Sequence, residues 1–315
     1  MHDVDILVTT TLPQPLLASL RDDYRCHDYA GAADPEALLA AVGRRIRGVV
    51  QGGWIATPAA LLDRLPALEL ISVFGVGYDG VPVDYCRGRG VRVTNTPDVL
   101  TEDVADVGLA LILMTMREFA RLDRFVRDGR WLAGGPWLTT RLAGRTVGIL
   151  GLGRIGAAIA RRVEALGMKV AWTGRRPRDV AWRYVPDLVE LARESDVLVV
   201  ACPGGPATRR LVDARVLEAL GPDGTLVNIA RGSIIDEEAL VRALAGGTIK
   251  GAGLDVYADE PRVPPAMLAM DNVVLLPHVG SATRETRQAM ADLCKANLDA
   301  WFDGGRVLTL VAELR

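Results

Sequence analysis

Three side chains suited to acid–base and electrostatic chemistry follow short apolar runs in the second half of the sequence. Arg231 follows the run TLVNIA, Glu260 lies in the loop after GAGLDV, and His278 ends the run VVLLPH. An arginine can pair with a carboxylate and polarise a neighbouring ketone, and an imidazolium can protonate the developing alkoxide. A glutamate hydrogen-bonded to that histidine would favour the imidazolium. These residue types predict reduction of a 2-oxo acid by a nicotinamide hydride, with no metal required.

Each of these residues also has a purely structural interpretation. Arg231 could form a surface salt bridge, Glu260 could be a loop carboxylate, and His278 could cap a helix or lie in the core. The chain contains three histidines, of which His2 is terminal and His27 lies in a polar stretch. His278 is therefore the histidine expected at a strand end, where doubly wound folds bind their ligands.

The elements that must position these residues alternate between apolar strands and helical patterns, as in parallel α/β folds. A helix over residues 101–128 is long enough to link two domains, and a last helical pattern over 284–305 has no strand partner in the second domain. We therefore expect that last helix to return to the first domain. The predicted fold is two doubly wound parallel-sheet, Rossmann-like domains with an active-site cleft between them. They are a discontinuous substrate-binding domain of residues 1–100 and 284–315, and a dinucleotide-binding domain of residues 101–283.

A glycine-rich turn, GLGRIG, lies between a buried strand and an amphipathic helix in the second domain. Its glycines would permit a tight turn, close approach of the backbone to a pyrophosphate, and close packing of helix on strand, while the helix N-terminus supplies N–H groups. This context favours a dinucleotide site over a simple turn. The predicted contacts are Gly151, Leu152, Gly153, Arg154, Ile155 and Gly156.

The end of the next strand carries an arginine pair where an NAD-preferring site would carry an acid. Gly174 occupies the position of the acid, and Arg175 and Arg176 follow it. A carboxylate there would repel a ribose 2′-phosphate, whereas guanidinium groups would bind it by charge-assisted hydrogen bonds. The sequence thus predicts NADP(H) in preference to NAD(H). The alternative is a solvated basic turn.

The composition of the chain favours a globular protein with a small-molecule ligand. Half of the 315 residues are apolar, and the net charge is −2, so neither a nucleic-acid partner nor a membrane partner is indicated. The four cysteines are scattered without a CxxC motif, which argues against a zinc site or disulfide framework and fits a reducing cytoplasm. The first residues lack the basic and apolar regions of a signal peptide, so a cytoplasmic location is expected.

Several motifs together resemble the D-isomer-specific 2-hydroxyacid dehydrogenase family: GLGRIG, NIARGSIIDEEAL, GAGLDV, DEP and LLPHVGSAT, in that order over nearly the whole chain. The resemblance implies Arg231, Glu260 and His278 as the catalytic set. It also implies a substrate loop in SVFGVGYDGV, where the backbone N–H groups of Val76 and Gly77 would hold the substrate carboxylate. Glycines on both sides of Val76 suit such close backbone approach.

Within the family, TPDVLT, TGRRPR and PWL are similar to segments of the NADP(H)-dependent glyoxylate/hydroxypyruvate reductases. That resemblance implies a homodimer through the cofactor domain, in which Trp137 reaches the substrate pocket of the neighbouring subunit; the alternative is packing within its own chain. Trp54 could line the pocket or be buried for packing. Further cofactor contacts implied are Cys202, Pro203, Thr208, Ile229, Asp255, His278 and Gly280, with Asp255 near the nicotinamide amide.

Two alternatives to a glyoxylate/hydroxypyruvate reductase remain open from the sequence. The first keeps the chemistry and changes the substrate to 2-ketogluconate or an aryl pyruvate. The second is a dinucleotide-sensing corepressor on the same fold, because fold alone does not determine function.

Overall fold

The structure is a computed structural model that describes residues 2–53 and 55–315. The chain divides into two compact units, one formed by Met1–Leu100 with Ser281–Arg315 and the other by Thr101–Gly280. Each unit is built around a parallel sheet, of five strands in the first and seven in the second. This is the predicted α/β class, and the second boundary lies three residues before the predicted one.

The sheet of the first unit has the strand order β2-β1-β3-β4-β5. Its central strands are continuous buried apolar runs, as expected for a sheet covered on both faces. The edge strand β2 was not predicted, because its sequence RCHD is polar and half-exposed. The bounds are β1 (Asp5–Val8), β2 (Arg25–Asp28), β3 (Ile46–Gly52), β4 (Leu70–Phe74) and β5 (Arg92–Thr94).

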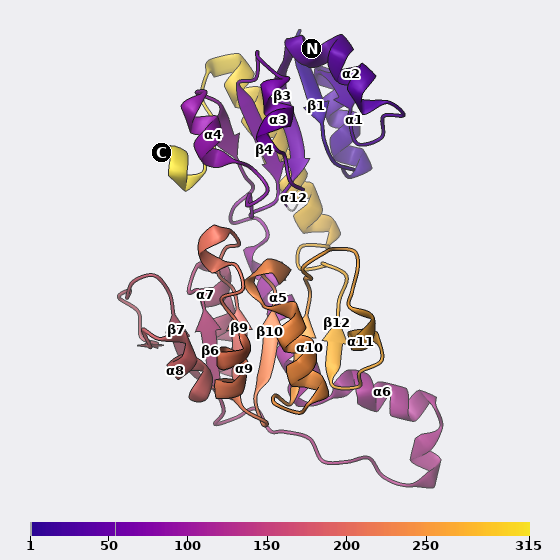
Figure 1. The fold of residues 1–315 in the computed structure, drawn as a ribbon, viewed down its shortest axis with the longest axis vertical. Helices are drawn as coiled ribbons and strands as arrows, with labels where there is room; N and C mark the ends of the chain where they lie inside the picture. Colours follow the sequence, from indigo (N-terminus) through magenta and orange to yellow (C-terminus); the bar gives the residue numbers. More distant parts are fainter. Residues whose placement is uncertain (1, 54) are drawn as a thin grey trace. The chain divides into compact units, whose positions relative to one another are not determined.

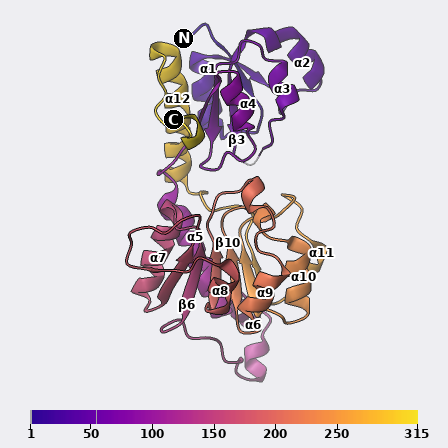
Figure 2. The same cartoon turned by 60° about the vertical axis from the view of Figure 1, so that its left-hand side comes forward.

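Helices cover both faces of this sheet, as Figure 2 shows. On one face lie α1 (Gln14–Asp23) and α12 (Arg284–Gly304), which pack against each other, and α12 also packs on β4. On the other face α2 (Pro35–Val42), α3 (Ala59–Asp63) and α4 (Val83–Gly88) bury their apolar side chains against the strands. The C-terminal helix thus completes a unit that begins at the N-terminus. Thr283 caps α12 by accepting the N–H of Thr286 at 3.2 Å.

The sheet of the second unit has the strand order β12-β11-β10-β9-β6-β7-β8, so the order reverses between β9 and β6. Ligands of doubly wound folds bind beyond the carboxyl ends of the strands at such a reversal. One face carries α5 (Thr101–Met116) and α7, and the other carries α8, α9 and α10 (Figure 1). The bounds are β6 (Thr146–Leu150), β7 (Lys169–Thr173), β8 (Arg183–Tyr184), β9 (Val197–Val200), β10 (Thr225–Asn228), β11 (Gly251–Leu254), β12 (Val273–Leu275), α7 (Arg154–Ala165), α8 (Leu188–Arg193), α9 (Ala214–Leu220) and α10 (Glu237–Ala245).

The register brings five strand ends of this sheet to the same level. Leu150 lies opposite Val200, Val200 opposite Asn228, and Asn228 opposite Leu254. Leu254 in turn lies opposite Leu275. The glycine turn and the loops that carry the predicted catalytic residues therefore leave one edge of one sheet.

The prediction of a single helix over residues 101–128 is wrong. The structure has two helices, α5 (Thr101–Met116) and α6 (Phe119–Arg127), and Glu118 between them has a φ of +51°. That left-handed conformation ends the hydrogen-bond ladder of α5. The Glu118 carboxylate accepts hydrogen bonds from Arg121 and from Trp137, so contacts distant in sequence determine the break. Beyond α6, residues 128–143 extend from the second unit and return (Figure 1).

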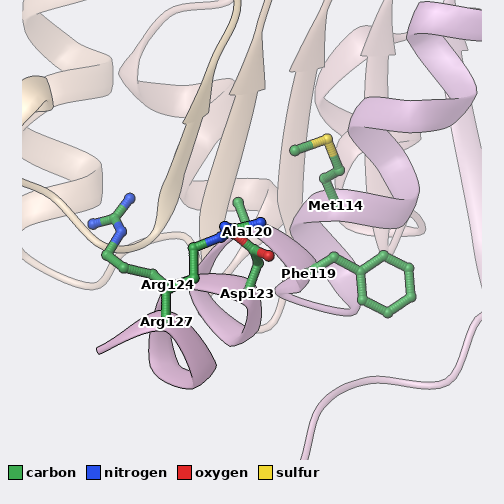
Figure 3. Close-up of a pocket in the computed structure, with 6 residues that line it drawn as sticks. All are labelled: Met114, Phe119, Ala120, Asp123, Arg124 and Arg127. Carbon is green, nitrogen blue, oxygen red and sulfur yellow. The ribbon is translucent and has the colours of Figure 1, made fainter. Parts of the chain in front are cut away.

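A cavity of about 490 Å³ lies beside the junction of these two helices (Figure 3). Its lining comes from α5 and α6 alone: Met114, Phe119, Ala120, Asp123, Arg124 and Arg127. None of the predicted site residues lines it, so we do not assign it to the chemistry. In the part of the chain that the structure describes, no helix has the length and apolar character needed to cross a bilayer.

Candidate active site

A histidine–carboxylate pair lies beyond the carboxyl ends of β11 and β12. His278 Nδ1 is 2.6 Å from Glu260 Oε2, and the backbone N–H of Tyr257 donates to Glu260 Oε1 at 3.0 Å. The side chains of His278 and Glu260 are 28% and 22% exposed. Because Nδ1 faces the carboxylate, the pair fixes the ring orientation and turns Nε2 to the opposite side.

The neighbours of Glu260 stabilise its ionised carboxylate. Burial alone would raise the pKa of this carboxyl group, but the hydrogen bond from His278, its charge and the Tyr257 N–H outweigh that effect. The nearby charge of Arg231 acts in the same direction, and the pKa of Glu260 falls below its ordinary value. An ionised glutamate at this position stabilises an imidazolium.

Asp255 holds the turn that carries the histidine. Its two carboxylate oxygens accept the backbone N–H groups of Val279 at 2.8 Å and Gly280 at 2.9 Å, and its carbonyl accepts the N–H of His278. Burial raises the pKa of Asp255, although both N–H donors act to lower it. His278 itself has a φ of +53°, an uncommon conformation outside glycine that surrounding structure must impose.

The loop after β10 brings Arg231 to the same region. The Asn228 side chain holds the start of this loop through two hydrogen bonds: it donates to the Arg231 carbonyl at 2.9 Å and accepts the N–H of Ala230 at 3.0 Å. Gly232 lies so close to the neighbouring loop that a Cβ there would be 1.9 Å from the Tyr257 carbonyl carbon. A glycine is therefore required for the Arg231 loop to pack against the loop that ends in Glu260.

These contacts place Arg231, Glu260 and His278 near one another within the second unit, and their catalytic role stays a prediction. Sequence reasoning missed the residues that position them, Asn228 and Tyr257, because an amide after a strand and a tyrosine in a loop are common. Arranged in this way, the three residues can supply a cation for an anionic substrate and a proton held by an ion pair. No group of three or more metal-ligating side chains occurs among the residues described.

The glycine turn between β6 and α7 has the shape that a dinucleotide requires. Gly151 has a φ of +99°, and a Cβ there would be 2.6 Å from the Cys202 backbone. A Cβ at Gly156 would be 2.2 Å from the Gly151 carbonyl, whereas the space around Gly153 is open. Gly153 is also the N-cap of α7 and has no side chain to cap the helix, and a helix N-terminus of this kind can bind phosphate oxygens. Leu152, Arg154 and Ile155 belong to the same turn.

Gly174, Arg175 and Arg176 follow β7 beside this turn. Both arginines are exposed, and neither guanidinium has a hydrogen-bond or ion-pair partner among the residues described. Sequence reasoning missed Arg178, whose guanidinium donates to the carbonyl of Leu152 in the glycine turn. The segment after β7 is therefore hydrogen-bonded to the glycine turn through Arg178. The Arg175 and Arg176 guanidinium groups have no counter-charge among the described residues.

The remaining predicted cofactor contacts lie around the same sheet edge. Cys202 is buried against Gly151, and Thr208 donates to the Pro203 carbonyl at 2.8 Å. Ile229 is buried directly after β10, and the N–H of Gly280 is bound by Asp255 as described above. Of these residues, Cys202 lies against the glycine turn, and none of them lies within 4 Å of a Cβ placed at Gly153.

The predicted substrate loop lies in the first unit, after β4. The Val76 carbonyl accepts the side chain of Asn95 at 2.8 Å, and the Gly75 carbonyl accepts the N–H of Thr96 at 2.9 Å. Within the described residues, no group accepts the N–H of Val76 or Gly77. Two successive backbone N–H groups without an acceptor among the described residues can donate to an anion. Trp54, the other pocket residue predicted in this unit, lies outside the described residues.

Trp137 is held by its own chain in this structure. Its indole N–H donates to Glu118 at 2.8 Å, the Arg121 guanidinium lies 3.9 Å from its ring centroid, and Phe125 packs edge-on at 5.7 Å. The neighbouring Leu138 is 97% exposed and Leu132 is 96% exposed. In this segment the Trp137 side chain therefore packs on its own chain, whereas Leu132 and Leu138 expose apolar side chains to solvent.

Comparisons with known proteins agree with this geometry. Residues 109–280 match the model of the D-isomer specific 2-hydroxyacid dehydrogenase, NAD binding domain. The chain is 45% identical to glyoxylate/hydroxypyruvate reductase A of Arabidopsis thaliana, over 99% of this chain and 100% of that protein. It is also 45% identical to hydroxyphenylpyruvate reductase of Plectranthus scutellarioides, with the same coverage of both chains.

A solved structure is similar over the whole length. The NADPH-dependent glyoxylate/hydroxypyruvate reductase of Sinorhizobium meliloti, in complex with NADP and malonate, superposes with a TM-score of 0.91. It is 46% identical, and the match covers 99% of this chain and 98% of that one. The chain belongs to the D-isomer specific 2-hydroxyacid dehydrogenase family, which confirms the predicted family and its two-sheet fold.

Proposed function

We propose that the protein is an NADP(H)-dependent reductase of small 2-oxo acids, with glyoxylate and hydroxypyruvate as the first candidates, giving glycolate and D-glycerate. The observation that carries the proposal is the His278–Glu260 pair at 2.6 Å beside the Arg231 loop. The names of two relatives add support, since glyoxylate/hydroxypyruvate reductases from a plant and a bacterium are each nearly half identical to this chain.

In the proposed mechanism, Arg231 pairs with the substrate carboxylate and polarises the ketone oxygen. His278, oriented through Nδ1 by Glu260, donates the proton on Nε2 to the developing alkoxide. The N–H groups of Val76 and Gly77 hold the substrate carboxylate. The bound dinucleotide supplies the hydride. Asp255 keeps the histidine turn in place while the ring changes its protonation state.

The proposed preference for NADP(H) rests on the arginine segment after β7. Two exposed guanidinium groups beside a phosphate-binding turn, with no acid at Gly174, suit a ribose bearing a 2′-phosphate. The nicotinamide end would lie toward Ile229, Asp255 and Gly280. NAD(H) lacks the 2′-phosphate and would lose only the contacts of that group with the arginines. We therefore expect weaker binding of NADH than of NADPH, with some activity remaining.

We also propose a homodimer through the segment that follows α6. Leu132, Leu138 and Trp131 are exposed there, and contiguous exposed apolar side chains are typical of protein interfaces. Seated on a second copy, this segment would bring Trp137 toward the substrate pocket of the neighbour. A cytoplasmic location is supported by four cysteines that are all free thiols.

The test is an NADPH-oxidation assay of the purified protein with glyoxylate, hydroxypyruvate, 2-ketogluconate and hydroxyphenylpyruvate. We expect the highest kcat/KM for one of the first two. A preference for hydroxyphenylpyruvate would favour an aryl-pyruvate reductase, the function named for an equally similar relative, and a preference for 2-ketogluconate would favour the sugar-acid alternative. Binding of NADPH without turnover of any 2-oxo acid would contradict the proposal and favour a dinucleotide sensor.

A further inference from the structure

Three contacts between α12 and β4 repeat every seven residues along the helix. Trp301 Nε1 donates to Glu69 Oε2 at 3.0 Å, just before the strand begins. Seven residues earlier on α12, the carbonyl of Cys294 accepts the Ser72 hydroxyl at 2.9 Å. Seven residues earlier again, the Arg287 guanidinium lies over the Phe74 ring, 5.7 Å from its centroid. The helix therefore runs antiparallel to the strand, and Arg287 lies at the carboxyl end of β4.

Of the three α12 residues in these contacts, Arg287, Cys294 and Trp301, only Arg287 has no polar partner among the described residues. The groups at Cys294 and Trp301 are hydrogen-bonded, whereas no residue in the described ranges forms a hydrogen bond or ion pair with the Arg287 guanidinium. The side chain is only partly exposed, and burial lowers the pKa of Arg287. A half-buried guanidinium, which stays charged, is costly without an anion.

The position of this cation connects it with the substrate loop of the same unit. Phe74, the ring beneath Arg287, is the residue directly before Gly75, and the unpaired N–H groups of Val76 and Gly77 follow at once. Two free backbone donors and one free guanidinium thus occur at the end of one strand. All three groups attract the same kind of ligand, an oxyanion.

We propose that Arg287 binds the substrate carboxylate in the first unit, together with the loop N–H groups. The inference rests on the proposed function, because it takes a 2-oxo acid as the ligand. The two arginines would differ in role. Arg231 would contact the carboxylate and also polarise the ketone as it reacts, whereas Arg287 would contact the carboxylate alone and contribute to binding in ground state and transition state alike. Uniform binding of that kind affects KM and not kcat.

The experiment compares Arg287→Gln, Arg287→Lys and the control Arg284→Gln, an exposed arginine at the start of the same helix. For Arg287→Gln we expect KM for glyoxylate and for hydroxypyruvate to rise alike, by about tenfold to a hundredfold, as for a lost charged hydrogen bond. The kcat value should change by less than about threefold. Arg287→Lys should recover part of the loss, because lysine keeps the charge without the planar fork. Arg284→Gln should match the wild type.

Malonate supplies a second readout that needs no turnover. With NADPH present, malonate should raise the Tm of the wild type and of Arg284→Gln, and it should raise that of Arg287→Gln much less. If the wild type proves inactive on 2-oxo acids, the proposed function fails while this comparison still tests Arg287.

Three results would overturn the proposal. The first is an unchanged KM and malonate response in folded Arg287→Gln. The second is a loss confined to hydroxypyruvate, which would place Arg287 at the substrate hydroxyl. If Arg287→Gln does not fold, Arg287→Lys decides: a wild-type Tm with KM raised at least about threefold supports the proposal, and an unchanged KM overturns it.

Discussion

Among the residues described, each unit contains one histidine–carboxylate pair within 2.6 Å, in addition to a longer contact of 3.6 Å between His2 and Asp303 in the first unit. In the first unit His27 Nε2 is 2.6 Å from Asp5 Oδ1, and in the second His278 Nδ1 is 2.6 Å from Glu260 Oε2. The first pair bridges two neighbouring strands, β1 and β2, at the edge of the sheet. The second lies in loops beyond the carboxyl ends of the strands. Only the second is placed where doubly wound folds bind substrates.

The surroundings of the two pairs differ as much as their positions. Asp5 is neighboured by the side chains of Arg25 at 4.0 Å and Arg45 at 3.7 Å, so the first pair belongs to a network of charged side chains. In the second pair, Glu260 accepts the backbone N–H of Tyr257, and His278 has a positive φ. The comparison teaches that pair geometry alone does not identify a catalytic histidine. What sets the His278 pair apart is backbone support beyond the strand ends.

The sharpest test of this comparison replaces one histidine at a time. His278→Asn should lower kcat by about 10²- to 10⁴-fold, the usual contribution of a general acid. Asparagine tolerates the left-handed conformation, so the turn should survive. His27→Asn should leave kcat within about threefold of wild type, since surface changes far from a site have small effects. Stopped-flow NADPH oxidation measures both, and equal losses in the two variants would remove the distinction.

The arginines of the two units can be compared in the same way. In the second unit, Arg175 and Arg176 have no hydrogen-bond or ion-pair partner among the described residues. In the first unit, Arg25 and Arg45 lie within 4.0 Å of the Asp5 carboxylate. Replacing the first two by alanine should raise KM for NADPH by about tenfold to a hundredfold, through lost charge-assisted contacts. The KM for NADH should hardly change. The double variant Arg25→Ala/Arg45→Ala should alter neither value, and a parallel rise with both cofactors would contradict the phosphate assignment.

The buried aspartates provide a third contrast. Asp255→Asn leaves one oxygen to accept two backbone N–H groups, so one of them loses its partner at a cost of about 1–3 kcal/mol. We expect a lower Tm together with a roughly tenfold fall in kcat, because the histidine turn loosens. Asp5→Asn should lower Tm without lowering kcat. Calorimetry and steady-state kinetics on the same preparations separate the two outcomes, and a Tm loss without a kcat loss in Asp255→Asn would show that the turn is not catalytic.

The smallest expected effect is the pH dependence of stability due to Glu260. Because its folded-state pKa is lowered, the ionised carboxylate stabilises the fold above the unfolded-state pKa, and the contribution is lost as pH falls through the folded value. Glu260→Gln should therefore cost about 1 kcal/mol at pH 7. The difference from wild type should shrink below the ordinary carboxyl value of 4.5. Urea unfolding at pH 7 and pH 4 measures this, and a constant difference would contradict the assigned charge.

The sheets, and the place of the candidate catalytic residues at strand ends, could be predicted from the sequence because both depend on local patterns. Buried strands are apolar runs, and Arg231, Glu260 and His278 each follow one at a motif position. The short edge strands β2 and β8 lack such runs, and neither was expected. The break at Glu118 was missed because it depends on Trp137, nineteen positions later. Arg287 was missed for a related reason: within a helical pattern it reads as a surface arginine, and only the packing of α12 on β4 shows its burial.

The return of α12 to the first unit has a consequence during synthesis. The face of β4 (Leu70–Phe74) that α12 covers is translated about 210 residues before α12 (Arg284–Gly304) begins. At about 5–20 residues per second, the nascent N-terminal sheet would wait roughly 10–40 s with that apolar surface open. We expect a released chain truncated after residue 280 to remain protease-sensitive over its first hundred residues while the second unit is resistant. Protection of both units in this truncated chain would show that the early sheet matures without its last helix.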